Sequence, residues 1–346
     1  MPSLSVQTPG SKLSLRSERV VLTSRDSSQP DVGIPLHELE QVVLAPGASL
    51  SSNLIAELLE RQIPIHTIDG NGRYLGGFNP ASPPRALTRL KQYQLSQTPD
   101  LALPLARILI ASKILNERRV LQRLHQRRGE GDQHLTQLTE LSTLADQSLQ
   151  ASSLDNLRGY EGASSATFMR AWACFLPKEF PFQRRSTRPP ANPVNAVISY
   201  LSALVYGEVL SRTFTTGLDP ALGLLHQPTD DRYSLPLDLM EPFRPAIIFP
   251  LALRFFAQGL LTSQSFIPKN PGGWLSPEGR GIVHQQFEKV LNREFLSTHL
   301  NHRTTLRQQL RATPLLFKAA LSDSQRWSPF LLNGTPKLPE EPAATT

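Results

Sequence analysis

The stretch that decides the fold reads Asn-Pro-Ala-Ser-Pro-Pro and occupies residues 79–84. Proline has no backbone N–H and a fixed φ angle, so this composition excludes both a β-ladder and a helix here. We therefore predict a proline-rich linker at residues 80–84, between an N-terminal domain of residues 1–79 and a C-terminal domain of residues 85–335. A chain of 346 residues is long enough for about two domains.

On the N-terminal side of this linker, apolar residues alternate with polar ones, which is typical of β-strands. A short helix capped by Ser51 or Ser52 interrupts the alternation, and Asp69-Gly70-Asn71-Gly72 has the residues of a hairpin turn. The strands are expected at residues 19–23, 38–44, 63–68 and 74–78. We predict a β-rich, sandwich-like domain.

On the C-terminal side the pattern becomes helical and stays so. Thr98, followed by Pro99 and Asp100, is typical of a helix start, because the hydroxyl can cap it and proline fits the first turn. Further helices are predicted at residues 133–148, 153–176, 193–216, 236–262 and 276–297. The fold class is therefore α+β, with an N-terminal β-rich domain, an all-α catalytic domain and, at residues 336–346, a disordered tail rich in Pro, Glu and Ala.

The composition excludes several classes of protein. Hydrophobic residues make up 39% and charged residues 19% of the chain, which is typical of a globular protein. The single cysteine, Cys174, excludes a disulfide framework and a thiolate zinc cluster within one chain. No uninterrupted apolar run reaches the roughly 18 residues of a membrane helix. The first residues lack an apolar signal core, so we expect a cytoplasmic protein with no membrane partner.

Basic residues are in excess and gather in one region. The chain has 36 Lys and Arg against 29 Asp and Glu, and residues 85–128 hold ten basic residues but only two acids. A solvated helix face that complements the helix dipole explains such a cluster, and so does contact with DNA phosphates, because guanidinium groups bind phosphate oxygens bidentately. The candidate DNA-binding residues are Arg85, Lys113, Arg118, Arg119, Arg123, Arg184, Arg185, Arg188 and Arg244.

Acidic residues and one histidine stand out in the helical part. Glu161 has Gly159 and Gly162 close by, which suits the close approach of a backbone or a ligand. Asp238 and Glu241 are three residues apart and so share one helix face. Taken singly, Glu161 is typical of a surface residue, His226 of a core or loop residue, and the acid pair of dipole complementation in a first turn.

Taken together, these carboxylates and His226 indicate a site for one or two divalent cations. The oxygen ligands favour Mg²⁺ or Mn²⁺, and an imidazole is better tolerated by Mn²⁺. A zinc hydrolase usually has more histidine ligands or two closely spaced histidines.

Several motifs, in order along nearly the whole chain, identify a family. They are IPLHELE at residues 34–40, the segment 92–119, RGYEG at 158–162, GLDPALGLLHQ at 217–227, LDLMEPFRP at 237–245 and WLSPEGR at 274–280. With them the chain resembles the CRISPR-associated integrase and endonuclease family, the catalytic subunit of the spacer-acquisition complex. The resemblance departs at Phe249 and Pro242, where members often carry acids.

The resemblance implies a β-rich dimerisation domain and a catalytic domain whose metal ligands are Glu161, His226 and Glu241, with Asp238 as a supporting acid. It implies a homodimer, and a four-to-two heterohexamer with a smaller ferredoxin-like adaptation subunit, bound to double-stranded DNA. The implied reaction is the insertion of spacers into a CRISPR array by attack of a 3′ hydroxyl on a phosphodiester, dependent on Mg²⁺ or Mn²⁺. The alternatives are a non-catalytic DNA-binding scaffold of the same complex and a repair nuclease acting on branched DNA.

Overall fold

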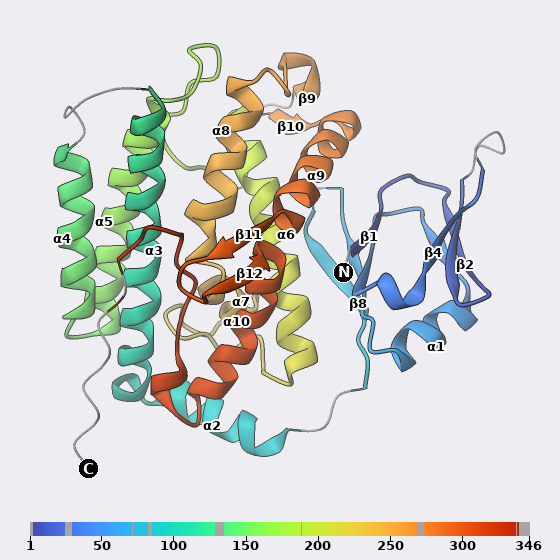
Figure 1. Ribbon diagram of the computed structural model, residues 1–346, viewed down its shortest axis with the longest axis horizontal. Helices are drawn as coiled ribbons and strands as arrows, with labels where there is room; N and C mark the ends of the chain where they lie inside the picture. The colour runs from blue at the N-terminus through green and yellow to red at the C-terminus, as the bar shows by residue number, and fades with distance from the viewer. Residues whose placement is uncertain are drawn as a thin grey trace. The chain divides into compact units, whose positions relative to one another are not determined.

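The computed structural model describes residues 3–24, 30–70, 72–81, 85–128, 135–187, 189–268, 273–336 and 338. The chain divides into two compact units, Met1–Pro84 and Arg85–Thr346, coloured from dark blue to light blue and from cyan to red in Figure 1. The division falls at the end of the proline-rich stretch, of which residues 82–84 lie outside the described part of the chain.

The N-terminal unit contains two four-stranded sheets that share one apolar core. In the first sheet the order is β1 (Ser3–Val6), β5 (Gln41–Leu44), β7 (Ile65–Ile68) and β8 (Tyr74–Phe78). In the second it is β4 (Val32–Pro35), β3 (Arg19–Thr23), β2 (Lys12–Arg16) and β6 (Ser49–Leu50). Helix α1 (Ser52–Glu60) begins after Ser51, whose hydroxyl accepts the Leu54 N–H.

Sequence patterning missed β1, β2, β4 and β6 of this unit and placed one strand too early. Residues 36–38 form a 3₁₀ turn, so the strand predicted at 38–44 begins only at Gln41. The core joins Leu13 and Val20 of one sheet to Val42 and Ile65 of the other, which fits the sandwich-like prediction.

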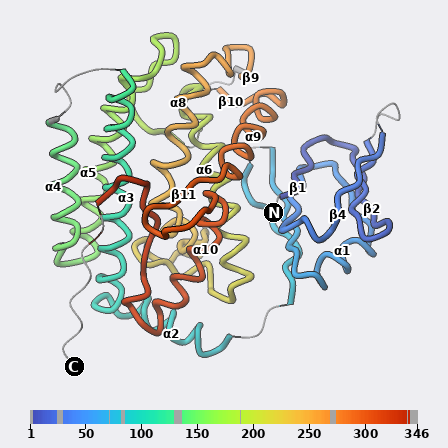
Figure 2. Tube along the Cα trace, in the orientation of Figure 1, coloured from blue at the N-terminus to red at the C-terminus, as the bar shows by residue number. Residues whose placement is uncertain are grey.

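The C-terminal unit is mostly helical. Its long helices are α2 (Ala86–Gln97), α3 (Pro99–Arg128), α4 (Leu135–Leu149), α5 (Leu154–Ala173), α6 (Pro193–Thr216), α9 (Pro277–Asn292) and α10 (Leu306–Ala320). Helices α3, α4 and α5 lie side by side, as Figures 1 and 2 show, and α6 packs against α10. The predicted order of a β-rich part followed by a helical part is confirmed.

Helix α6 is the central helix of this unit. Among the described residues it is the one helix long and apolar enough to cross a membrane by length and composition, but 72% of its most apolar window is buried inside the protein. Its side chains at Val197, Leu201, Val205 and Val209 are fully enclosed by neighbouring elements. We therefore interpret α6 as a core helix.

The single helix predicted at residues 236–262 is wrong. Helix α7 ends at Leu239, a π-helical turn covers Arg244–Ile248, and α8 covers Phe249–Ala257. Pro242, Pro245 and Pro250 lack the N–H that a continuous α-helix needs. A π turn places side chains where a regular helix does not, and it often marks a functional site.

The helical unit also contains two short hairpins, so it is not all-α. Strands β9 (Phe266–Pro268) and β10 (Gly273–Leu275) form one, and β11 (Glu294–Ser297) and β12 (His302–Thr305) form the other. The helix predicted at 276–297 therefore ends at Asn292. Of the predicted tail, residues 337 and 339–346 lie outside the described part of the chain.

Candidate active site

A cavity of about 260 Å³ in the C-terminal unit brings together charged side chains from distant parts of the sequence. Helix α3 contributes Lys113 and Glu117, α5 contributes Glu161, and the segment between α7 and α8 contributes Glu241 and Arg244. Phe168, Ile198 and Phe249 form an apolar wall. The cavity thus combines carboxylates, cations and a surface that excludes water.

The ammonium group of Lys113 joins the two predicted ligands Glu161 and Glu241. Lys113 Nζ donates a hydrogen bond to Glu161 Oε1 and lies 2.7 Å from Glu241 Oε2, and its side chain is 5% exposed. Lys113 was predicted to contact DNA from a basic face. The structure does not place Lys113 on an exposed face, because its buried ammonium is engaged by carboxylates, and contact with DNA stays a prediction.

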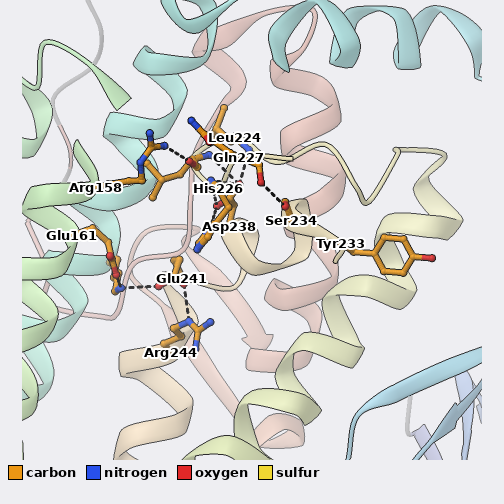
Figure 3. Close-up of polar contacts among 12 residues, drawn as sticks. Arg158, Glu161, Leu224, His226, Gln227, Tyr233, Ser234, Asp238, Glu241 and Arg244 are labelled. Carbon is orange, nitrogen blue, oxygen red and sulfur yellow. Dashed lines mark hydrogen bonds and ion pairs between the residues drawn. The ribbon is translucent and has the colours of Figure 1, made fainter. Parts of the chain in front are cut away.

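Glu241 is held ionised by its two cationic neighbours. Burial alone would raise the pKa of this carboxyl group, but Arg244, whose Nε lies 2.8 Å from Glu241 Oε1, and Lys113 lower the pKa to about 2. The same carboxylates keep the pKa of Lys113 above its usual value despite burial. Figure 3 shows Glu161 and Arg244 approaching Glu241 from different elements.

His226 is fixed by Asp238. The Asp238 carboxylate is fully buried and accepts the backbone N–H groups of Leu224, Leu225 and His226 at 2.5, 3.0 and 3.1 Å. It also pairs with His226 Nδ1, so the imidazole carries its proton on Nδ1 and Nε2 is the nitrogen able to bind a cation. Burial lowers the pKa of His226, but Asp238 and, through space, Glu241 outweigh it and raise the pKa.

A second group of contacts holds the loop that carries His226. Arg158 of α5 donates from Nη1 to the Leu225 carbonyl at 2.7 Å, and Ser234 Oγ donates to the Gln227 carbonyl at 3.1 Å (Figure 3). From α2, the buried Gln92 amide donates to the Asp219 carbonyl at 2.7 Å. The loop is therefore tied to α5, to α7 and to α2.

The four predicted site residues thus fall into two linked pairs. Glu161 and Glu241 both contact Lys113, and His226 contacts Asp238 directly. Asp238 lies three residues before Glu241 in the sequence, which links the two pairs. No group of three His, Cys, Asp or Glu side chains in the described part of the chain is arranged around one point. Lys113 accounts for this, because its ammonium lies between the two carboxylates.

The donor set nevertheless fits a divalent cation. Carboxylate oxygens and an imidazole backed by a buried carboxylate are the ligands that Mg²⁺ and Mn²⁺ accept. Three carboxylates, those of Glu117, Glu161 and Glu241, line the cavity together with three cationic side chains, those of Lys113, Arg185 and Arg244.

Glu117 was missed as a site residue. It lies one turn after Lys113 on α3, it is 1% exposed, and burial raises its pKa to about 7 although Lys113 opposes the shift. In the sequence it stood out only as an acid in a basic segment. Its spacing of four residues from Lys113 was the available signal, because that spacing places both on one face of a helix.

Phe249 and Pro242, the two positions at which the sequence departs from the family pattern, have structural roles here. Phe249 packs edge-on against Phe168 and Trp172, with ring centroids 4.9 and 5.2 Å apart. The Pro242 carbonyl accepts a hydrogen bond of 2.9 Å from the fully buried Asn116 amide. Phe249 therefore makes one wall of the cavity apolar, and Pro242 anchors the segment that carries Glu241 to α3.

Several predicted DNA-binding arginines make contacts within the protein instead. Arg119 and Arg123 both donate to the Asn333 carbonyl, at 3.0 and 2.6 Å, and so hold the red C-terminal segment on α3 (Figure 2). Arg118 donates to the Leu138 carbonyl at 3.2 Å, and Arg185 donates to Ser199 Oγ at 3.0 Å. For these four, the contacts support a role in anchoring the fold, and Arg185 also lines the cavity.

The remaining DNA candidates differ in their surroundings. Arg85 and Arg184 are exposed and therefore accessible to a polyanion. Arg244 is half-buried at the cavity, where it pairs with Glu241. Arg188 lies outside the described residues.

The glycines of the two site motifs are expected to respond to substitution in opposite directions. A Cβ added to Gly223 would lie 2.6 Å from the His226 carbonyl oxygen and 2.7 Å from Asp238 Oδ2, whereas one added to Gly159 or Gly162 meets nothing within 4 Å. Gly223→Ala should therefore lower the free energy of unfolding by about 2 kcal/mol through overpacking. Gly159→Ala, inside α5, should raise it by about 0.5–1 kcal/mol. Urea unfolding of the two variants checks both signs, and equal effects would contradict the geometry.

Stability in the absence of metal is expected to fall as the pH rises from 5 to 7.5. Glu117 has a folded-state pKa of about 7 against an ordinary value of 4.5, so its favourable contribution is complete below pH 4.5 and is lost as the pH rises through 7. The loss is at most about 3 kcal/mol. Glu241 has the opposite sign, but its contribution is lost only as the pH falls from 4.5 toward 2.

Urea unfolding in EDTA at pH 5, 6, 7 and 8 measures this slope, and Glu117→Gln isolates it because histidines titrate alike in both proteins. The wild type should lose more stability across the range than Glu117→Gln. Parallel curves would show that Glu117 does not titrate there.

The chain is similar in sequence to known proteins along most of its length. The family model described as "CRISPR associated protein Cas1" matches residues 4–289. A CRISPR-associated endonuclease Cas1 of Thermus thermophilus is 31% identical over 330 residues, which cover 95% of this chain and 99% of that protein. A Cas4 exonuclease–Cas1 endonuclease fusion of Rhodospirillum rubrum is 30% identical over 322 residues. This match covers 91% of the present chain but only 55% of the longer fusion protein.

Solved structures share the fold at lower identity. A casposase bound to its integration product matches with a TM-score of 0.78 and 21% identity, covering 99% of this chain and 96% of that one. A Cas6-RT-Cas1–Cas2 complex matches with a TM-score of 0.73 and 22% identity, covering 94% of this chain and 35% of that one. The family model and the full-length relative agree with the motifs and with the fold, so the chain belongs to the Cas1 family of CRISPR-associated proteins.

Proposed function

We propose that this chain is a metal-dependent DNA endonuclease and integrase that inserts spacers into a CRISPR array. The observation that carries the proposal is the meeting of Glu161 and Glu241 at one cavity, with the Asp238-backed His226 close enough to Glu241 to interact with it through space. The Cas1 relatives are named endonucleases, and a casposase with the same fold is bound to an integration product. Both are consistent with cutting and joining of phosphodiesters.

Glu161, Glu241 and His226 would hold the Mg²⁺ or Mn²⁺ ion. A divalent ion there would supply Lewis-acid chemistry, lowering the pKa of an attacking 3′ hydroxyl and neutralising charge that develops at phosphorus. The supporting residues act on these ligands. Asp238 keeps His226 in one tautomer, and Arg244 orients the carboxylate of Glu241.

The rest of the cavity suits a phosphodiester. Arg244 and Arg185 line it and supply positive charge for phosphate oxygens. Phe168, Ile198 and Phe249 reduce the access of water, and water would compete with the hydroxyl for the phosphorus. Exposed arginines such as Arg85 and Arg184 would hold the DNA backbone outside the cavity.

The proposed partners are double-stranded DNA, a second copy of the chain bound through the N-terminal unit, and a smaller Cas2 subunit. A Cas1–Cas2 complex among the fold relatives supports the last of these. We propose four copies of this chain for two of the smaller subunit.

An integration assay tests the function. The purified chain, with and without the small subunit, is incubated with a labelled DNA duplex and a plasmid carrying a CRISPR array, in Mg²⁺, Mn²⁺ or EDTA. Labelled plasmid is expected with either metal and not in EDTA. DNA binding without metal-dependent joining or cutting would instead support a non-catalytic scaffold, and cleavage of branched DNA alone would support a repair nuclease.

A further inference from the structure

Glu117 is a buried carboxylate whose hydrogen-bonding capacity is largely unused. It lines the cavity at 1% exposure, and its Oε2 accepts no hydrogen bond. Its Oε1 lies 3.4 Å from Ser165 Oγ, at the long limit of a hydrogen bond. A buried carboxylate in this state is destabilising, because it has lost its hydrogen bonds to water without gaining others in the protein.

The Ser165 hydroxyl beside Glu117 is shared with another carboxylate. Ser165 Oγ also lies 3.2 Å from Glu161 Oε1, and one hydroxyl hydrogen cannot serve both oxygens fully. The shared hydroxyl shows that the carboxylates of Glu117 and Glu161 approach the same point from α3 and α5. Two carboxylates that converge in a buried cavity repel each other unless a cation lies near both.

Lys113 acts on Glu117 through space but makes no direct contact with it. Its ammonium contacts Glu161 and Glu241, and among the described residues no cationic side chain forms an ion pair with Glu117. A purely structural role as the counterion of Lys113 would place the two groups in contact. The geometry therefore leaves Glu117 facing the cavity with a charge that nothing in it pairs directly.

We infer that Glu117 is a further cation-binding carboxylate, which binds the divalent metal ion together with Glu161 and Glu241. This inference rests on the proposed metal-dependent function and adds a residue to its site. A small hard cation takes oxygen ligands, and it would satisfy the Oε2 atom of Glu117, which accepts no hydrogen bond. Glu117→Gln keeps the shape of the side chain and removes the charge that the cation needs.

Binding of Mn²⁺ tests the inference without any measurement of activity. The free ion is titrated by electron paramagnetic resonance against the full chain and its Glu117→Gln, Glu161→Gln and Glu140→Gln variants. Glu140 is a matched control, because it accepts a hydrogen bond of 2.8 Å from the Thr167 hydroxyl but does not line this cavity. Glu117→Gln is expected to weaken Mn²⁺ binding roughly tenfold or more, as Glu161→Gln does, while Glu140→Gln binds as the wild type.

The melting temperature gives a second readout. Mn²⁺ should raise it in the wild type and raise it less in Glu117→Gln, since a ligand stabilises in proportion to its affinity. A merely structural change would shift the melting temperature equally with and without metal. Glu117→Asp, which keeps the charge but shortens the side chain, should bind Mn²⁺ between the wild type and Glu117→Gln, and this second variant provides the comparison should Glu117→Gln fold poorly.

The outcomes separate this inference from the proposed function. Wild-type binding of Mn²⁺ with unchanged affinity in Glu117→Gln overturns the role of Glu117 and leaves the metal-dependent function standing. No binding by the wild type overturns both.

Discussion

Replacing Glu161 with glutamine is expected to lower metal-dependent DNA joining roughly a thousandfold, because the reaction loses charge stabilisation at its transition state. The side chain projects from α5 into the cavity, is 28% exposed and contacts Lys113 Nζ, so the amide fits the same space. The effect should appear in the rate of joining rather than in DNA affinity. Removal of one negative charge beside a polyanion should leave DNA binding equal or slightly tighter.

The measurement is single-turnover joining in saturating Mn²⁺ together with a DNA-binding titration of the same preparations. Glu140→Gln again serves as the control and should join DNA at the wild-type rate. Joining by Glu161→Gln at the wild-type rate would remove Glu161 from the ligand set. A parallel loss of DNA affinity would point instead to a misfolded cavity.

Much of the fold follows from local sequence rules. Helix α6 begins and ends at the predicted residues because Asn192 caps it, Pro193 fits its first turn and Gly217 takes the left-handed conformation at its end. The break after α7 was missed, although its prolines are visible in the sequence, because the apolar pattern of residues 236–262 continues through it. Apolar periodicity reports which face is buried, but not whether the backbone hydrogen bonds remain regular.

The candidate site was predictable as a set of residues but not as an arrangement. Glu161, His226, Asp238 and Glu241 lie in motifs that identify the family, so the resemblance points to them. The roles of Lys113 and Glu117 become visible only when α3 packs against α5 and against the segment after α7, and that segment is more than a hundred residues further along the chain than α3. The same limit explains the arginines: a run of charges in the sequence does not show that Arg119 and Arg123 hold Asn333 rather than DNA.

Removing the ammonium of Lys113 is expected to give the largest loss of stability in the metal-free protein. Lys113→Met leaves Glu161 and the buried Glu241, which is 6% exposed, without the cation that both contact. Breaking a buried ion pair from one side costs about 3–5 kcal/mol, since the remaining charge stays desolvated. The free energy of unfolding in EDTA should fall by this amount, whereas Lys289→Met, at an exposed position on α9, should change it by less than about 0.5 kcal/mol.

Added Mn²⁺ should return much of this loss, because the divalent ion supplies positive charge to the carboxylates that Lys113 no longer neutralises. Mn²⁺ should therefore raise the melting temperature of Lys113→Met more than that of the wild type. The double variant Lys113→Met with Glu161→Gln should be more stable in EDTA than Lys113→Met alone. It removes one of the two carboxylate charges, those of Glu161 and Glu241, that Lys113 no longer neutralises. If Lys113→Met unfolds in EDTA at the same urea concentration as the wild type, or if Mn²⁺ stabilises both proteins equally, Lys113 does not act as the cation of the metal-free site.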